Sequence, residues 1–333
     1  MAKAHEIKGI NCYGAATPGI RAALKERFDE MYARRQDALN FKDPEGVHSM
    51  RVASRRLRSS LRSFMPYLNK SALTPALQEI KTIADALGTV RDQDVAILAL
   101  ENLSSKMPKE FLSPLERLID SRKLSRDTAR HDLKKVIAKR RLKELSVQFG
   151  LALESVAQHQ ATPIIPESDQ SYISVAKTII RDHLTELEQL SDGLYLPSDY
   201  GPLHEMRIAA KRLRYAIELF ASCWEGKLEL FAKHAARLQT DLGQLHDCDV
   251  WIESLEDKIG KSKTADRFES ETLVWLFTHY HGQRNKYYRG AFSRWAKWRA
   301  DNLSDKLRDL TQPSAEDEIK PSGSASASSS LLR

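Results

Sequence analysis

Apolar residues between residues 47 and 64 recur every three or four positions, as they do along one face of a helix. At 100° per residue, Val47, Met50, Leu57, Leu61 and Phe64 fall within an arc of about 100°, the usual width of a core-facing stripe. The same period runs through nearly all of the chain up to residue 310. The pattern predicts an all-α protein.

Composition supports this prediction and helps to place the helix ends. Gly (14) and Pro (12) are scarce among 333 residues, whereas the helix formers Ala, Leu, Arg, Lys and Glu recur throughout. Gly88 and Gly243 are expected to end helices. Prolines are expected to stand near helix starts, at positions 18, 75, 108, 114 and 202.

The two halves of the chain resemble each other at an offset of 156 residues. Residues 47–64 and 203–220 share eight identities in eighteen positions. About forty residues later, Leu-Gly-x-x-x-Asp-x-Asp-Val occurs at residues 87–95 and again at 242–250. This similarity indicates an internal duplication, with each half forming an up-and-down helical bundle.

Breaks in the helical pattern divide the chain into four parts. Residues 1–157 are predicted to form the first bundle repeat and residues 173–310 the second. Residues 158–172, with Pro163 and Pro166, are predicted to be a linker. Residues 311–333 are rich in Ser and Ala, bury little apolar surface and are predicted to be a disordered tail.

A basic row lies beside each apolar stripe. Spacings of three and four place His48, Arg51, Arg55, Arg58 and Arg62 within an arc of about 80°, over roughly 21 Å of helix. The row returns in the second half as His204, Arg207, Lys211 and Arg214.

Such a row can be a solvated surface, or its arginines can pair with acids on neighbouring helices. Solvated faces normally mix both signs, however, because like charges four residues apart repel each other. The first row contains no acid between His48 and Arg62. Asp92, Asp94, Asp247 and Asp249 could pair with only some of the arginines.

Two further segments concentrate positive charge, although the whole chain carries only +7. Residues 117–143 hold eleven Lys or Arg against three Asp, and residues 284–299 hold six Lys or Arg and no acid. From these segments we expect Arg126, Arg130, Arg284 and Arg289 to contribute to the site. This uneven distribution predicts a polyanionic partner, and the planar guanidinium of Arg can hold two phosphate oxygens.

No pattern in the chain supports an enzyme or a metal centre. The residues of Asp92-x-Asp94, Asp247-x-Asp249, His279-x-His281 and His246-x-Cys248 would point about 200° apart on a helix. For the aspartates we therefore favour capping or salt bridges at helix starts over Mg²⁺ binding. We expect no catalytic residue, no metal and no cofactor. His48 and His204 could donate to phosphate, bind a metal, accept a phosphoryl group or be structural.

Nucleic acid is the other polyanion to consider. Tyr287, Tyr288, Trp295 and Trp298 lie among the basic residues of the last long helix and could stack on bases. Packing in the core is the favoured interpretation of these residues. A ligand made only of phosphate suits the two basic rows better, because they hold few aromatic residues.

The motif His-x-x-Arg-(x)₃-Arg/Lys-Arg-Leu-Arg with a following Phe, and the later Leu-Gly-x-x-x-Asp-x-Asp-Val, resemble the conserved histidine α-helical domain (CHAD) family. Both motifs occur twice and in the same order, and the resemblance covers roughly residues 14–310. It implies two pseudo-symmetric helical bundles whose basic surfaces face a common groove that binds inorganic polyphosphate. The triphosphate-tunnel hydrolase domain attached to many members has no counterpart here.

The resemblance implies a set of polyphosphate-binding positions, and it adds Arg56 and Arg212 to those of the basic rows. The matching positions are His48, Arg51, Arg55, Arg56, Arg58, His204, Arg207, Lys211, Arg212 and Arg214. His246 stands where the first half has Arg91, and Glu218 where it has Arg62, so the halves are expected to contribute unequally.

These observations favour non-enzymatic binding of polyphosphate, for recruitment to polyphosphate stores. The alternatives are a nucleic-acid-binding module and a metal-dependent polyphosphate hydrolase or phosphotransferase. No apolar run approaches the roughly 20 residues of a membrane-spanning helix, so we expect no membrane partner. Three scattered cysteines predict free thiols in a reducing compartment, and hence a cytoplasmic protein associated with polyphosphate granules.

Overall fold

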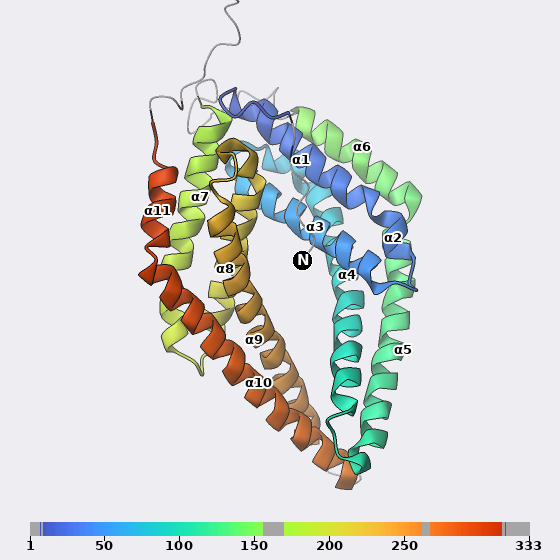
Figure 1. The fold of residues 1–333 in the computed structure, drawn as a ribbon. Helices are drawn as coiled ribbons and strands as arrows, with labels where there is room; N and C mark the ends of the chain where they lie inside the picture. Colours follow the sequence, from blue (N-terminus) through green and yellow to red (C-terminus); the bar gives the residue numbers. More distant parts are fainter. Residues whose placement is uncertain (1–6, 8, 156–169, 262–266, 315–316, 318–333) are drawn as a thin grey trace, which may run out of the picture.

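The computed structural model of the chain describes residue 7, residues 9–155, 170–261 and 267–314, and residue 317 (Figure 1). Every regular element in these ranges is a helix, and the sole β-type pairing among them is an isolated bridge between Ala15 and Ser171. The predicted all-α class is confirmed. None of the described helices combines the length and apolar composition that crossing a membrane requires.

The α-helices of the first half are α1 (Ala16–Ala33), α2 (Arg35–Leu39), α3 (Pro44–Phe64), α4 (Lys70–Ser104), α5 (Leu112–Val136) and α6 (Lys139–Ser155). Those of the second half are α7 (Tyr172–Gln189), α8 (Tyr200–Leu219), α9 (Glu229–Lys261), α10 (Arg267–Ala300) and α11 (Leu303–Leu310). Short 3₁₀ helices connect some of them: η1 (Met65–Tyr67), η2 (Lys109–Phe111), η4 (Ser191–Tyr195) and η5 (Ala221–Trp224). Helices α7 and α8 begin 156 residues after α1 and α3, which is the offset of the sequence repeat.

Two of the predicted helix ends are wrong. Gly88 lies inside α4 and Gly243 lies inside α9, so neither glycine terminates a helix. Of the prolines, Pro75 lies inside α4, near its start. Asp43 caps α3 by accepting a hydrogen bond from the Glu45 amide, and Pro44 occupies the first helical position, where no amide hydrogen is needed.

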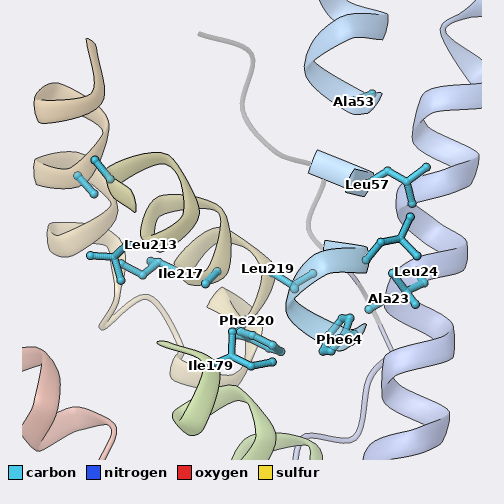
Figure 2. Packing of buried hydrophobic residues seen from close by; sticks show 14 of the residues in the cluster. Ala23, Leu24, Ala53, Leu57, Phe64, Ile179, Leu213, Ile217, Leu219 and Phe220 are labelled. Carbon is cyan, nitrogen blue, oxygen red and sulfur yellow. The ribbon is translucent and has the colours of Figure 1, made fainter. Parts of the chain in front are cut away.

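The core consists of two clusters of buried apolar residues. The larger cluster continues from one half into the other, and the rings of Phe64, Tyr172 and Phe220 meet at the junction. Figure 2 shows Phe64 and Phe220 facing each other there. The smaller cluster joins α4 and α5 to α9 and α10, where the long helices converge at the lower end of Figure 1. The two halves therefore pack together at both ends of α4 and α9.

Residues near the predicted seam hold the halves together. Ser171 caps α7, and Tyr172 begins that helix with a buried ring, so the linker does not extend to residue 172 as predicted. Cys12 forms a disulfide with Cys223, which corrects the prediction of free thiols and removes its support for a reducing compartment. Cys248 is a buried free thiol, as predicted.

The predicted tail begins later than residue 311. Thr311 is buried, and the carboxylate of Asp317 lies 2.6 Å from the ammonium of Lys177 in α7. These contacts hold the start of the tail against the second half. Residues 315–316 and 318–333, and residues 156–169 of the linker, lie outside the described part of the chain.

Candidate functional site

Helices α3 and α8 carry the two basic rows and pack against each other where the halves meet (Figure 1). Their apolar stripes are buried: Met50 and Leu57 on α3, and Met206 and Leu213 on α8, have no more than a trace of exposed surface. Because each basic row lies directly beside its apolar stripe, burial of the stripes brings the rows together along the junction.

Lys211 lies at the centre of the combined rows. Burial is the largest cause of its lowered pKa of about 7, and the charges that lower the pKa further are those of Arg55, Arg207, Arg62 and Arg212. These arginines come from both α3 and α8, so the structure brings the two predicted rows into one site. The charged groups that shift the pKa of Lys211 are all cations.

The pKa values of two arginines beside Lys211 are also lowered, although Asp247 opposes the shift of Arg207 and Glu186 opposes that of Arg62. Burial lowers the pKa of Arg207, and Arg55 and Arg51 lower it further. Burial also lowers the pKa of Arg62, with the charges of Arg212 and Arg58 adding to the effect. This crowding of partly desolvated cations is unfavourable by itself, and a bound anion would relieve it.

Arg51 and Arg58 are accessible, and the charge of each guanidinium is partly neutralised by a nearby carboxylate. The Arg51 guanidinium lies 3.2 Å from the Asp92 carboxylate, and that of Arg58 lies 3.8 Å from Asp85. The aspartates are largely exposed, and such surface pairs stabilise a fold by at most about 1 kcal/mol. Both arginines can therefore exchange these partners for a phosphate group at little cost.

Gly88 provides the space that the Arg51 guanidinium occupies. A Cβ atom added at Gly88 would lie 2.4 Å from Nη1 of Arg51. The Leu-Gly pair of the repeated motif is therefore part of the site in the first half. The second copy differs, because a Cβ atom at Gly243 would have no neighbour within 4 Å.

Three of the predicted site residues are buried in ion pairs. Arg56 lies 3.1 Å from Glu30 and 3.7 Å from Glu218, and Arg214 lies 2.6 Å from the same Glu218. Arg284 lies 2.6 Å from Asp249. All three are less than a tenth exposed, so we assign them to the support of the site and not to its surface. Glu218, which departs from Arg62 of the first half, neutralises two of these cations.

The remaining predicted arginines lie around this centre. Arg212 pairs with Glu186, at the offset of 156 residues from the Arg56–Glu30 pair. Arg126 and Arg130 lie 3.7 and 3.4 Å from Asp94 on α4. Arg289 is exposed on α10, and nothing in the described part of the chain connects it with Lys211.

The two aspartates of the first pair point in different directions, as the helical geometry predicted, but they do not lie at a helix start. Asp92 pairs with Arg51, whereas Asp94 points to Arg126 and Arg130 on α5, so the two side chains serve different neighbours. Both aspartates lie within α4 and not at its start. Trp295 and Trp298 are buried, which confirms packing as their role.

The histidines at the start of the two rows are held neutral. Burial lowers the pKa of His48, and Arg91 and Arg55 lower it further. The Nδ1 atoms of His204 and His246 are 3.4 Å apart, and burial together with Arg207 lowers the pKa of His246 to about 4. At neutral pH these rings are hydrogen-bonding groups without charge, and a bound anion would favour their protonation.

Sequence reasoning did not include Gly88, Arg91, Asp247 and His246 in the site. Arg91 lowers the pKa values of His48 and Arg51, and Asp247 raises that of Arg51 in the other half and that of Arg207 in its own half. The repeat alignment contained a signal for two of them, because Arg91 and His246 occupy equivalent positions in the two copies. That the Arg91 and His246 side chains lie toward the basic rows follows only from the positions of α4 and α9 in the structure.

Comparison with known proteins agrees with this arrangement. The CHAD domain family model matches residues 22–256. Among solved structures, the CHAD domain from the plant Ricinus communis superposes with a TM-score of 0.64 at 20% identity, covering 96% of this chain and 99% of that chain. PptA from Streptomyces chartreusis superposes with a TM-score of 0.59 at 14% identity, covering 85% of this chain and 100% of that chain.

Because both sequence identities are low, these two structural likenesses show the fold and nothing beyond it. None of the curated proteins matches the sequence. The family model covers more than two thirds of the chain, including the basic rows of α3 and α8 and both copies of the Leu-Gly motif. The chain belongs to the CHAD domain family.

Proposed function

We propose that this protein binds inorganic polyphosphate across the paired rows of α3 and α8, without catalysing a reaction on it. The observation that carries the proposal is the position of Lys211 among Arg55, Arg62, Arg207 and Arg212. A flexible chain of phosphates can follow such a line of cations and make several charge-assisted hydrogen bonds at once. Association with polyphosphate stores would follow from this binding.

The arrangement also indicates which side chains bear the ligand. Arg51, Arg55, Arg62, Arg207 and Lys211 combine access with a crowded cationic environment that nearby carboxylates offset only in part. The buried Arg56 and Arg214 hold the two helices in place through Glu30 and Glu218. His48 is available to donate one hydrogen bond, and of His204 and His246, which share an Nδ1–Nδ1 hydrogen bond, one neutral ring keeps its N–H for the ligand.

The proposal is tested by titrating the protein with long-chain polyphosphate at several salt concentrations, using single-stranded RNA and duplex DNA as parallel ligands. We expect tight polyphosphate binding that weakens as salt rises, with both nucleic acids weaker at the same salt. Equal binding of all three would favour a general polyanion surface. Release of orthophosphate with Mg²⁺ or Mn²⁺ present would show that the protein is a hydrolase.

Substitution separates the site from its support. We expect Arg207→Gln to weaken polyphosphate binding at least tenfold, because it removes a charge-assisted contact of about 1.5 kcal/mol or more. Arg267→Gln is the matched control: it makes the same change of charge at an exposed arginine that pairs with Glu271 on α10. Equal weakening by both variants would place the binding outside the paired rows.

A further inference from the structure

The basic row of α8 begins beside an exposed aromatic residue. On a helix, Tyr200, His204, Arg207 and Lys211 fall within an arc of about 60°, and Tyr200 precedes Arg207 by about 10 Å of helix. The Tyr200 side chain is 46% exposed although it begins the helix that carries the charges. An aromatic ring therefore stands at the open end of a line of phosphate-binding groups.

One face of the Tyr200 ring is already covered by a cation. The guanidinium carbon of Arg284 lies 4.8 Å from the ring centroid, and Asp249 fixes this arginine by an ion pair of 2.6 Å. The ring is thus held by a cation on one face, and nearly half of the Tyr200 surface is exposed. A planar aromatic ligand can stack on that free surface.

The surroundings of Tyr200 form a shallow, open pocket. The pocket has a volume of about 550 Å³ and is lined by residues 195–201 at the end of η4 and the start of α8. Within this segment Tyr195 and Leu196 are also more than half exposed. The Tyr195 ring packs edge-on against Phe292, and its hydroxyl accepts a hydrogen bond of 3.3 Å from Arg299. The aromatic wall is therefore anchored to α10.

The first half carries a different feature at the corresponding end: the Phe41 ring, just before α3, has the cations of Arg130 and Lys134 on α5 at 5.1 and 5.3 Å from its centroid. The residue equivalent to Tyr200 is Pro44, at the offset of 156 residues. At the offset of 158 residues that relates Arg126 to Arg284, the first half carries Arg130 and Lys134 where the second carries Tyr288 and Phe292. The two ends therefore differ in degree: two cations of α5 lie over Phe41, whereas Tyr200 has one cation of α10 over its ring and is 46% exposed.

We propose that the pocket at Tyr200 is a nucleobase subsite, and that the protein binds nucleoside oligophosphates with the base on Tyr200 and the phosphates along His204, Arg207 and Lys211. The inference rests on the proposed function, because it assigns the phosphate chain to the same basic row. The spacing of about 10 Å between Tyr200 and Arg207 along α8 suits a base joined through ribose to a short phosphate chain. The pocket offers a stacking surface for one base, and the cations lie on only one side of it, along α8. This arrangement favours a small nucleotide over a nucleic-acid strand.

The test compares adenosine 5′-tetraphosphate with inorganic tetrapolyphosphate by calorimetry at one salt concentration. The inorganic compound carries at least as much negative charge, so electrostatics alone predicts that it binds as tightly or more tightly. We expect the adenosine compound to bind about tenfold more tightly, since stacking of one base on an aromatic side chain is worth a factor of this order. Equal or weaker binding of the adenosine compound would refute the inference.

Substitutions at position 200 supply the control. Tyr200→Ala is expected to abolish the advantage of the adenosine compound while changing the affinity for inorganic tetrapolyphosphate less than twofold. Tyr200→Phe keeps the ring and is expected to keep the advantage. An advantage that survives in Tyr200→Ala would place the base elsewhere. Failure of both tetraphosphates and of long-chain polyphosphate to bind would refute the proposed function itself.

Discussion

Gly88 allows the binding role of Arg51 to be tested without touching a charged residue. In Gly88→Ala the new Cβ atom would lie 2.4 Å from Nη1 of Arg51, a separation that no real pair of such atoms tolerates. The guanidinium is the far end of a flexible side chain, so it can move away while the backbone of α4 stays in place. The substitution therefore displaces one phosphate-binding group and keeps its charge.

Two effects of opposite sign follow from this change. Replacing Gly by Ala inside a helix stabilises the folded state by about 1 kcal/mol, because Gly loses more backbone freedom on folding. Displacement of Arg51 costs a charge-assisted hydrogen bond to the ligand of about 1.5 kcal/mol, or about tenfold in Kd. We expect a variant with unchanged or higher stability and about tenfold weaker polyphosphate binding.

Gly243→Ala is the matched control, since Gly243 is the equivalent residue in α9 and its added Cβ atom meets nothing within 4 Å. It is expected to raise the free energy of unfolding by about 1 kcal/mol, a rise in Tm of about 2 °C, and to leave binding unchanged. Thermal unfolding followed by circular dichroism gives the stability, and calorimetric titration gives the affinity.

A double-mutant cycle decides whether Gly88 acts through Arg51. If it does, Gly88→Ala combined with Arg51→Ala should bind no more weakly than Arg51→Ala alone. Additive losses, or an equal loss of affinity in Gly243→Ala, would show that the effect arises from the helix and not from the guanidinium. Wild-type affinity in Gly88→Ala would refute the assignment of Arg51 to the ligand.

Three further predictions concern titration and covalent support. Lys211→Met should raise the free energy of unfolding at pH 7: the drop in pKa from 10.5 to about 7 corresponds to roughly 5 kcal/mol, of which we expect about 2 kcal/mol because water still reaches the ammonium group. Between pH 7 and 10.5 the unfolded wild-type chain holds more protons than the folded chain, so the stability of the wild type should rise with pH. The stability advantage of Lys211→Met, measured by urea unfolding at each pH, should therefore shrink. A difference that stays constant with pH would contradict this prediction. Binding of polyphosphate should be accompanied by uptake of protons by Lys211 and His246, so the affinity should fall from pH 6 to pH 8. Calorimetric titration in buffers of different ionisation enthalpy measures this uptake. Binding heats that do not depend on the buffer would refute it. Cys12→Ser should lower the free energy of unfolding by about 2–4 kcal/mol, and reduction of the wild-type disulfide by dithiothreitol should match that loss and add nothing in the variant.

The sequence was sufficient for the fold class and for the direction of the basic rows, because both depend on the helical period. The same angular reasoning separates Arg56 from the row of Arg51 and Arg55, and the structure buries Arg56 against Glu30. Arg56 entered the predicted site through the family motif alone. Arg212 entered the same way, but its side chain is partly exposed and lies near Lys211, so the helical angle excluded correctly only Arg56.

What the sequence could not predict depends on the placement of distant segments. Arg214 has the correct angle for the basic row, but Glu218 on the same helix and Gln239 on α9 bind its guanidinium. The Cys12–Cys223 disulfide joins residues 211 positions apart, a pairing that no local pattern encodes. The role of Gly88 depends on the distance between α3 and α4, so the sequence alone suggested a helix end.

Comparison of the two halves separates scaffold from ligand-binding surface. Ion pairs that hold helices together recur at the repeat offset: Arg56–Glu30 matches Arg212–Glu186, and Asp94 and Asp249 each bind an arginine of the following long helix. The cations of the basic rows recur as well, whereas some positions beside them differ, as with Arg91 and His246.

Cations gathered at a junction repel each other, so both copies must keep the carboxylates that anchor the helices behind them. The cations of the rows recur in both halves, but residues beside them differ, so the two halves offer a ligand similar charges with different neighbours. An asymmetric ligand, with a phosphate chain at one end and an aromatic group at the other, is what an asymmetric site on a repeated scaffold is suited to bind.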